Sequence, residues 1–411
     1  MKLYLKGYGS YNRNNNIDDL VREIKQNAQD AKSSTSNSLT EVLAGVFSLW
    51  TIITSETMFE DTKDSSCLIR PHVVQLIAIF RLLGMDKSNT LFDSIWNYLY
   101  RSKLNGHLIE VGTGEGKSIL LGGLSCVLSL LDFDVYCASY SKHLSSRDYE
   151  AFLPLFKQLN ISDKIHYSTL SELAETVINS KGDIRNAVNN FLLSKHTNTY
   201  SSYSRSHSSK PKRILLIDEV DVFFSPDFFG STYNPVSQYC SNETQAIFNY
   251  IWINKSRKVQ FQEIQQLQEY ASLISSFRSE AVGFINQQIN YIINDCESFD
   301  SPHYEIVTLE DGSKKIGYKD QDSINCKLSY GYRTSFAYLH EVSRHPGLAA
   351  YVNDALSIQI PCGSFSYAEI PKYSFECIMG VTGIYQIYFY HNNNHNNHNY
   401  YYNLVILTLF M

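Results

Sequence analysis

The amino-acid sequence predicts an α/β fold: a parallel sheet with flanking helices, plus an inserted α+β domain and an N-terminal helical segment. Short apolar runs at 104–111, 133–139 and 213–217 alternate with stretches of helical periodicity. This alternation is typical of parallel strands that are connected by crossover helices. After about residue 229, helical stretches and a hairpin signal replace the alternation. We therefore expect one parallel-sheet domain that is interrupted by a second, mixed domain.

The composition is that of an ordinary folded protein. The chain has 411 residues, which favours two or three domains of roughly 150 residues each. Hydrophobic residues make up 44% of it, close to the ~45–50% of soluble proteins, which excludes a wholly disordered chain, a coiled coil and a collagen. The net charge of −6 argues against a protein that coats nucleic acid, because phosphate contacts need clustered Lys and Arg. No nucleic-acid partner is expected.

Cysteine usage and hydropathy favour a cytoplasmic protein. None of the 8 cysteines forms a CxxC pair, so neither a zinc knuckle nor a disulfide framework is indicated. Residues 1–16 lack the apolar core of a secretory signal. No segment reaches the roughly 18 uninterrupted apolar residues that a membrane-spanning helix needs.

The N-terminal helical segment covers residues 1–69 and leads into the parallel-sheet domain at 70–228. Apolar residues recur at helical spacing over 17–54. A second helical stretch runs from Pro71 to about residue 100, and proline suits the first turn of a helix, where its missing N–H has no partner. A long apolar helix is expected to begin near Lys117, directly after the first strand and its glycine-rich turn.

The inserted α+β domain is predicted over 229–370. It contains an Asp-Gly turn between alternating strands within 303–319, which is a strong hairpin signal. The segment 371–384 is expected to return to the parallel-sheet domain and complete it. The segment 385–411 is rich in His, Asn and Tyr and is predicted to be an irregular, low-complexity tail rather than a metal site.

The segment after the first strand has the composition of a phosphate-binding loop. It matches G-x-x-x-x-G-K-[ST] in all but the first position, where Val111 stands. Its glycines allow backbone N–H groups to turn inward around a phosphate, and the following helix directs its positive end at the same anion. Lys117 would contact the outer phosphates, and the Ser118 hydroxyl would bind Mg²⁺. A glycine-rich turn without a ligand is the alternative. The residues assigned to nucleotide binding here are Gly112, Thr113, Gly114, Glu115, Gly116, Lys117 and Ser118.

Two acidic residues follow the strand at 213–217. In P-loop enzymes the first acid of such a pair holds Mg²⁺, and this would be Asp218. The second would polarise the attacking water, and this would be Glu219. The metal ligands are thus predicted to be Ser118 and Asp218, and the catalytic residues Glu219 and Lys117. Together with the phosphate-binding loop, the pair indicates a P-loop ATPase whose cofactors are ATP and Mg²⁺.

Five segments of the chain resemble, in order, motifs of the SecA preprotein translocase ATPase family. The resemblance implies a RecA-like P-loop domain, with Arg70 and Gln75 at the adenine base. It also implies an inserted domain that contacts a polypeptide substrate, and the possibility of peripheral association with a membrane. The matching segments are RPHVVQL (70–76), TGEGKS (113–118), SYSKHLSSRD (139–148), DEVD (218–221) and GVTG (380–383).

The sequence departs from that family in three places. Ser141 and Lys142 stand where family members have Asn-Asp, and Ile384 stands where they have Thr. No counterpart of the family's second RecA-like domain or of its zinc-binding tail follows residue 384. We therefore expect a truncated or mis-spliced frame that hydrolyses ATP weakly alone, because the second domain supplies an arginine that completes the hydrolytic site.

Two other classes of function remain as alternatives. The first is a nucleic-acid helicase of the DEAD-box type, which shares the RecA-like core, although residues 70–76 lack its usual adenine-binding elements. The second is a non-catalytic nucleotide-binding scaffold whose helical part at 245–295 serves as a docking surface. The acidic balance and the long insertion favour the SecA-like interpretation over the helicase.

Overall fold

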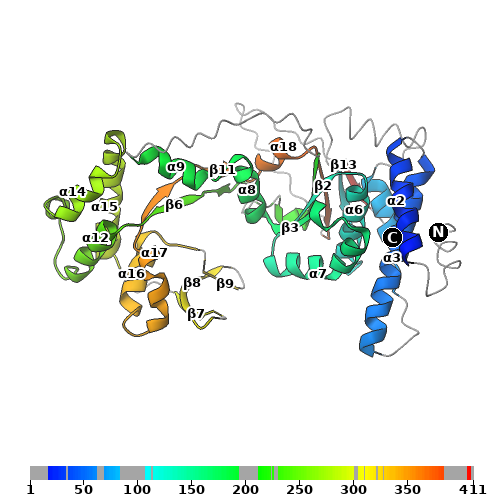
Figure 1. The fold of residues 1–411 in the computed structure, drawn as a ribbon. Coiled ribbons are helices and arrows are strands. Elements are labelled where there is room, and N and C mark those ends of the chain that lie inside the picture. Colours follow the sequence, from blue (N-terminus) through cyan, green and yellow to red (C-terminus); the bar gives the residue numbers. More distant parts are fainter. Residues whose placement is uncertain are drawn as a thin grey trace. The chain divides into compact units, whose positions relative to one another are not determined.

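The computed structural model divides the chain into two compact units (Figure 1). The first unit consists of Met1–Val177, Ser206–Tyr233 and Phe365–Met411, and the second of Ile178–Arg205 and Asn234–Ser364. The residues that the structure describes are 17–33, 36–62, 69–83, 107–112, 114–193, 212–223, 225, 230–299, 304–309, 311–320, 323–326, 328–383 and 405–408.

A sheet of parallel strands forms the centre of the first unit. Its strand order is β13-β1-β12-β4-β2-β3, and each neighbouring pair is parallel. The middle strands are apolar runs because a parallel sheet is buried on both faces. The strands are β1 (His107–Glu110), β2 (Asp134–Ser139), β3 (Ile165–Thr169), β4 (Arg213–Asp218), β12 (Cys377–Thr382) and β13 (Val405–Thr408).

Strand β12 comes from the far end of the chain and lies between β1 and β4. Its Gly380 is level with Leu108 on one side and with Ile217 on the other. A Cβ atom added at Gly380 would lie 2.3 Å from a methyl carbon of Val220 and 3.2 Å from the Ile217 carbonyl oxygen. Glycine at this position therefore lets the returning strand enter the sheet beneath the helical turn that follows β4.

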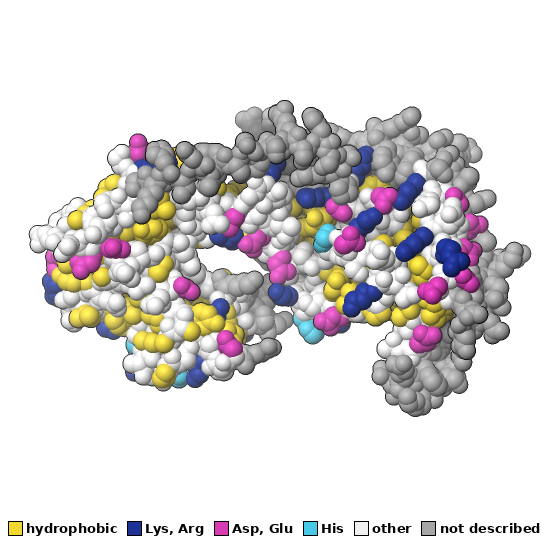
Figure 2. All heavy atoms as spheres, in the orientation of Figure 1, with side chains coloured by type: hydrophobic (Ala, Val, Ile, Leu, Met, Phe, Trp, Pro, Cys, Tyr) yellow, Lys and Arg dark blue, Asp and Glu magenta, His cyan; other side chains and the backbone are white. Residues whose placement is uncertain are grey.

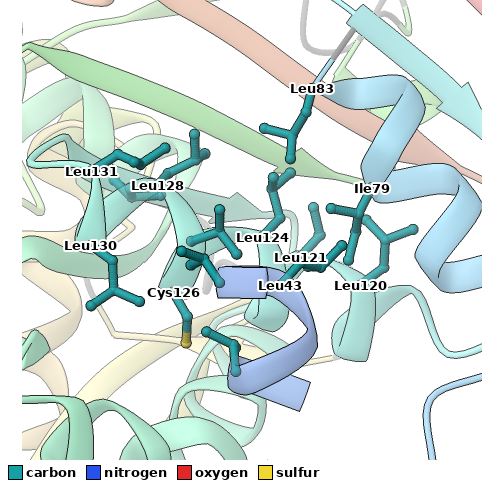
Figure 3. Close-up of a cluster of buried hydrophobic side chains, with 14 of the residues drawn as sticks. Leu43, Ile79, Leu83, Leu120, Leu121, Leu124, Cys126, Leu128, Leu130 and Leu131 are labelled. Carbon is teal, nitrogen blue, oxygen red and sulfur yellow. The ribbon is translucent and has the colours of Figure 1, made fainter. Parts of the chain in front are cut away.

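Helices cover both faces of this sheet. Ile214 and Leu216 of β4 pack with α2, α3, α4, α6 and α7 on one face, whereas Leu215 and Ile217 pack with α8 and α10 on the other. Leu43 of α3, Ile79 of α4 and Leu124 of α6 point into one buried cluster (Figure 3). The helices are α2 (Ile17–Ser33), α3 (Ser36–Thr62), α4 (Val73–Leu82), α6 (Lys117–Leu130), α7 (Lys142–Leu159), α8 (Leu170–Ile178), α10 (Val220–Phe223) and α18 (Ile370–Ser374).

Helix α3 is long and apolar enough, by length and composition alone, to cross a membrane over Ser38–Thr57. However, 56% of that window is buried within the fold. Phe47 is completely buried, and the ring of Trp50 stacks on Phe152 of α7 with the ring centroids 6.2 Å apart. These contacts are typical of a core helix. The N-terminal helices thus pack directly on the sheet domain.

The second unit combines helices with two small antiparallel sheets. Strand β6 pairs with β10, and β8 pairs with both β7 and β9. Buried side chains such as Phe248, Ile289 and Phe336 form its core. Its elements are α9 (Ile184–Leu192), β6 (Val236–Tyr239), α12 (Asn242–Ile253), α13 (Phe261–Gln265), α14 (Gln268–Ser275), α15 (Val282–Glu297), β7 (Glu305–Thr308), β8 (Lys314–Asp320), β9 (Ser323–Asn325), α16 (Tyr332–Glu341), α17 (Ala349–Ala355) and β10 (Ile358–Pro361).

Two predicted segments, the hairpin at 303–319 and the tail at 385–411, have different outcomes in the structure. The hairpin predicted at 303–319 is confirmed, since β7 and β8 pair across a turn in which Gly312 has φ +79°. The irregular tail predicted over 385–411 is wrong at Val405–Thr408, where an apolar, β-branched run pairs with β1. The rest of that tail lies outside the described residues, as does most of the helical stretch predicted beyond residue 83.

The second unit does not coincide with the predicted insertion at 229–370. It spans 234–364, because the short strands β5 (Thr232–Tyr233) and β11 (Phe365–Ser366) pair within the first unit. It also includes α9, which precedes β4 in the sequence. Val188 and Leu192 of α9 pack against the core of the second unit, and Leu193 bridges to Phe277.

Candidate nucleotide-binding site

The loop between β1 and α6 is shaped by two glycines in the left-handed region of backbone space. Gly114 has φ +89° and Gly116, which caps α6, has φ +73°. Such angles are accessible to glycine at little cost and are strained for other residues. The Glu115 N–H donates to the Gly112 carbonyl oxygen at 3.2 Å, which closes the turn. The loop therefore leads into the N-terminus of α6, where backbone N–H groups favour an anion. Thr113 lies outside the described residues.

Gln75 of α4 contacts the backbone of this loop through its side chain. Its side chain is buried, and its Nε2 donates to the Glu115 carbonyl oxygen at 2.7 Å. Its Oε1 accepts from the His72 N–H at 2.9 Å. A Cβ atom added at Gly116 would lie 2.4 Å from the Gln75 Nε2. Alanine at 116 would thus displace the Gln75 amide from the Glu115 carbonyl oxygen, in addition to straining the backbone. Arg70 is exposed, just before α4.

Ser118 and Lys117 begin helix α6 directly after the loop. The Ser118 Oγ donates to the Asp148 Oδ2 at 2.8 Å. Asp148 belongs to α7 and is buried, and its Oδ1 accepts from the neighbouring Arg147. Asp148 ends the 139–148 segment, and the sequence alone does not predict a role for it. Its burial against α6 depends on how two helices pack, and no local pattern encodes this.

The acidic pair lies at the carboxyl end of β4, the position where sheets of this kind bind ligands. The Asp218 Oδ1 accepts from the Glu219 N–H at 3.0 Å. Glu219 has φ +57°, which is unusual for a residue with a side chain. Strained backbone of this kind is concentrated at functional sites. The turn after Glu219 continues into α10.

Charge and burial connect these residues into one cluster. The pKa of Asp218 is raised to about 6, mainly by burial and then by the charges of Glu219 and Asp148, while the charge of Lys117 opposes the increase. Burial, and after it the charge of Asp221, also raise the pKa of Glu219, whereas the charge of Lys117 lowers it. The carboxylates of Asp218 and Glu219 thus repel each other and their acidic neighbours in surroundings that are partly shielded from water. A cation would relieve that repulsion.

The residues present fit a nucleotide-bound Mg²⁺. This ion takes oxygen ligands, and in nucleotide sites it is held by one or two protein groups together with phosphates and waters. Ser118 and Asp218 offer a hydroxyl and a carboxylate near the N-terminus of α6, and Lys117 is close enough to shift the pKa of Asp218. The structure thus brings Gly112, Gly114, Glu115, Gly116, Lys117, Ser118, Asp218 and Glu219 to the same edge of the sheet.

Comparison with known proteins gives one family. The family model described as SecA DEAD-like domain matches residues 8–224, which is more than half of the chain. No curated protein matches the chain. The match agrees with the RecA-like arrangement of a parallel sheet with flanking helices and implies membership of the P-loop ATPases. The chain therefore belongs to the SecA DEAD-like domain family, with a first nucleotide-binding domain of the SecA type.

Proposed function

We propose that this chain binds ATP with Mg²⁺ at the loop between β1 and α6 and hydrolyses it. The observation that carries the proposal is the cluster of Lys117 with Asp218, Glu219 and Asp148 at the end of β4. Lys117 would hold the outer phosphates as a point charge, and Ser118 and Asp218 would hold the metal. When bound, Mg²⁺ neutralises charge on the phosphates and orients them.

Glu219 is the proposed base that orients water for attack. Burial and the charges of Asp221 and Asp148 raise the pKa of its carboxyl. A carboxylate with a raised pKa is a stronger base than an ordinary surface glutamate. Glu219 directly follows Asp218 at the carboxyl end of β4, so both acids lie at the same end of the sheet.

The adenine base is proposed to lie beside Arg70 and Gln75. Gln75 contacts the back of the phosphate-binding loop, and its Oε1 has a second lone pair beyond the one that accepts from His72. If the carboxamide contacts adenine, Gln75→Ala should reduce the preference for ATP over GTP in a binding competition. An unchanged preference would limit Gln75 to supporting the loop.

We further propose that nucleotide turnover is coupled to polypeptide transport and that the second unit contacts an extended polypeptide. Hydrophobic side chains gather on the visible face of this unit (Figure 2). Its exposed apolar residues include Phe191, Ile253, Tyr291 and Tyr330. Of the aromatic residues that the sequence offered for this contact, Tyr330 is exposed, whereas Tyr332 and Phe336 are buried in the core.

The coupling is tested by ATP turnover of the full chain with and without an unfolded polypeptide. Stimulation by polypeptide, together with crosslinking from a photoreactive residue at Tyr330, is the expected result. A matched probe at the buried Phe336 should capture nothing. Stimulation by single-stranded RNA instead would support the helicase alternative, and nucleotide binding with no turnover would support the scaffold. Flotation with anionic vesicles tests peripheral membrane association.

A further inference from the structure

Asp148 has a bonding partner for each of its carboxylate oxygens. The Oδ2 accepts from the Ser118 Oγ at 2.8 Å, and the Oδ1 accepts from the Arg147 Nε at 2.9 Å and from its Nη2 at 2.7 Å. The Asp148 side chain is 11% exposed, whereas that of Arg147 is 56% exposed. Because arginine is always protonated, both of these hydrogen bonds to the Asp148 Oδ1 come from a charged donor.

The bond to Asp148 determines how the Ser118 hydroxyl can be used. A serine hydroxyl has one proton to donate and two lone pairs. With its proton directed to Asp148, the Ser118 oxygen presents its lone pairs away from α7. Lone pairs are what a cation needs, and a charged hydrogen-bond acceptor behind a ligand also makes that ligand more basic.

Direct ligation of the metal by Asp148 fits the structure less well. Both of its oxygens already have donors, and a metal ion would have to displace either Ser118 or Arg147. Ser118 lies in the first turn of α6, immediately after the phosphate-binding loop. Asp148 lies within the neighbouring helix α7 and reaches this turn through its bond to Ser118. The geometry favours an action of Asp148 through Ser118.

We infer that Asp148 is a positioning residue for the nucleotide's Mg²⁺: it fixes the Ser118 hydroxyl so that the oxygen faces the metal. This inference rests on the proposed function. It gives the buried Asp148 carboxylate a role in metal affinity, beyond that of joining α7 to α6.

The test measures the binding of a fluorescent ADP analogue to the full chain across a Mg²⁺ titration and in EDTA. Asp148→Ala should raise the Mg²⁺ concentration needed for tight binding by about 10–100-fold, the usual effect of losing a partner behind a metal ligand. Binding in EDTA should hardly change, because the loop and Lys117 remain. Glu150→Ala, on an exposed position of the same helix, is the matched control and should behave as wild type.

A double-mutant cycle separates positioning from a general structural role. If Asp148 acts through Ser118, then Asp148→Ala should add no loss in Mg²⁺ dependence to Ser118→Ala. Additive losses, or an unchanged Mg²⁺ dependence in Asp148→Ala, would overturn the inference. Should Asp148→Ala melt below the assay temperature, Asp148→Asn keeps the shape, and it should give a smaller shift of the same sign. A wild-type chain whose nucleotide binding ignores Mg²⁺ would reject the proposed function, and the inference with it.

Discussion

The Thr382 Oγ1 donates a hydrogen bond to the Asp221 Oδ1, and the two oxygens are 2.6 Å apart. The carbonyl oxygen of the same threonine accepts from the Val111 N–H at 2.8 Å. Thr382 is buried at the end of β12 and thus bonds to both halves of the site, the acidic segment after β4 and the start of the phosphate-binding loop. Thr382 therefore links the two halves by hydrogen bonds, in addition to the pairing of β12 with β1 and β4.

Thr382→Val keeps the shape of this side chain and removes its hydroxyl. Because Asp221 then loses a donor, we expect the free energy of unfolding to fall by about 1–3 kcal/mol. Thr382→Ser, which retains the hydroxyl, should stay closer to wild type. Urea denaturation in EDTA measures both variants. A loss in Thr382→Ser with none in Thr382→Val would mean that the methyl group, and not the hydrogen bond, is what matters.

The two loop glycines should differ in how well they tolerate alanine. Both have positive φ, so each substitution introduces backbone strain of roughly 1–2 kcal/mol. Only at Gly116 would the new methyl group also meet the Gln75 side chain, since nothing lies within 4 Å of a Cβ atom at Gly114. Thermal melting should therefore show Gly116→Ala to be less stable than Gly114→Ala. Adding Gln75→Ala should recover part of the difference, and no recovery would argue against the steric explanation.

Asp218→Asn should stabilise the protein in the absence of metal. Burial and the neighbouring carboxylates raise the pKa of Asp218 from 3.8 to about 6 in the folded chain. The folded state therefore binds this proton more tightly than the unfolded state does, and ionisation destabilises the fold. The gain from Asp218→Asn should be full above about pH 6, on the order of 3 kcal/mol, and should shrink as the pH falls towards 4.

Urea denaturation in EDTA across this pH range measures the gain. Asp163→Asn removes the same charge from an exposed residue and is the matched control. A variant Asp218→Asn that is less stable than wild type at pH 7 would show that the carboxylate is not under repulsion.

Asp132 should contribute stability with the opposite pH dependence. It lies in the turn between α6 and β2, where it accepts hydrogen bonds from Lys32 and from Lys164, the latter at 2.8 Å. Burial alone would raise the pKa of Asp132, but the two lysines outweigh burial and lower it. Its stabilising effect is thus present above the unfolded value of 3.8 and lost as the pH falls through the lower folded value.

Asp132→Asn isolates this charge, because asparagine tolerates the left-handed backbone, φ +68°, at this position. Since the Asp132 side chain is 60% exposed, the loss near pH 7 should be at most about 1 kcal/mol. The loss should disappear as the pH falls through the lowered folded-state value, and it should also shrink in high salt. A loss that is independent of pH would point to packing rather than charge.

The strands that build the site were predictable because burial on both faces makes them continuous apolar runs. Residues 213–217, for example, are apolar after the first and lie in the middle of the sheet as β4. Strand β3, with the sequence IHYST, was missed because it is largely polar and lies at an edge. Edge strands carry a weaker apolar pattern, so their sequence resembles that of a loop.

The site was predictable in its residue types but not in its contacts. The glycine spacing at 112–116 and the pair at 218–219 follow from chemistry that any phosphate-binding loop needs. The bond between Ser118 and Asp148 joins two helices, and that between Thr382 and Asp221 spans more than a hundred residues. Contacts of this kind depend on how the sheet brings segments together, and local patterns do not contain them. The membership of α9 in the second unit was unpredictable for the same reason.

The most direct test of the proposed site compares ATP binding and ATP turnover in Lys117→Ala and Glu219→Gln, each in the presence of Mg²⁺. Lys117→Ala removes the charge that holds the phosphates, so binding should be lost. Glu219→Gln keeps the shape of the side chain and leaves Asp218 to hold the metal. Binding should therefore survive, while turnover falls by ~10²–10⁴-fold. An equal loss of ATP binding in both variants, or unchanged binding in Lys117→Ala, would contradict the site described for this chain.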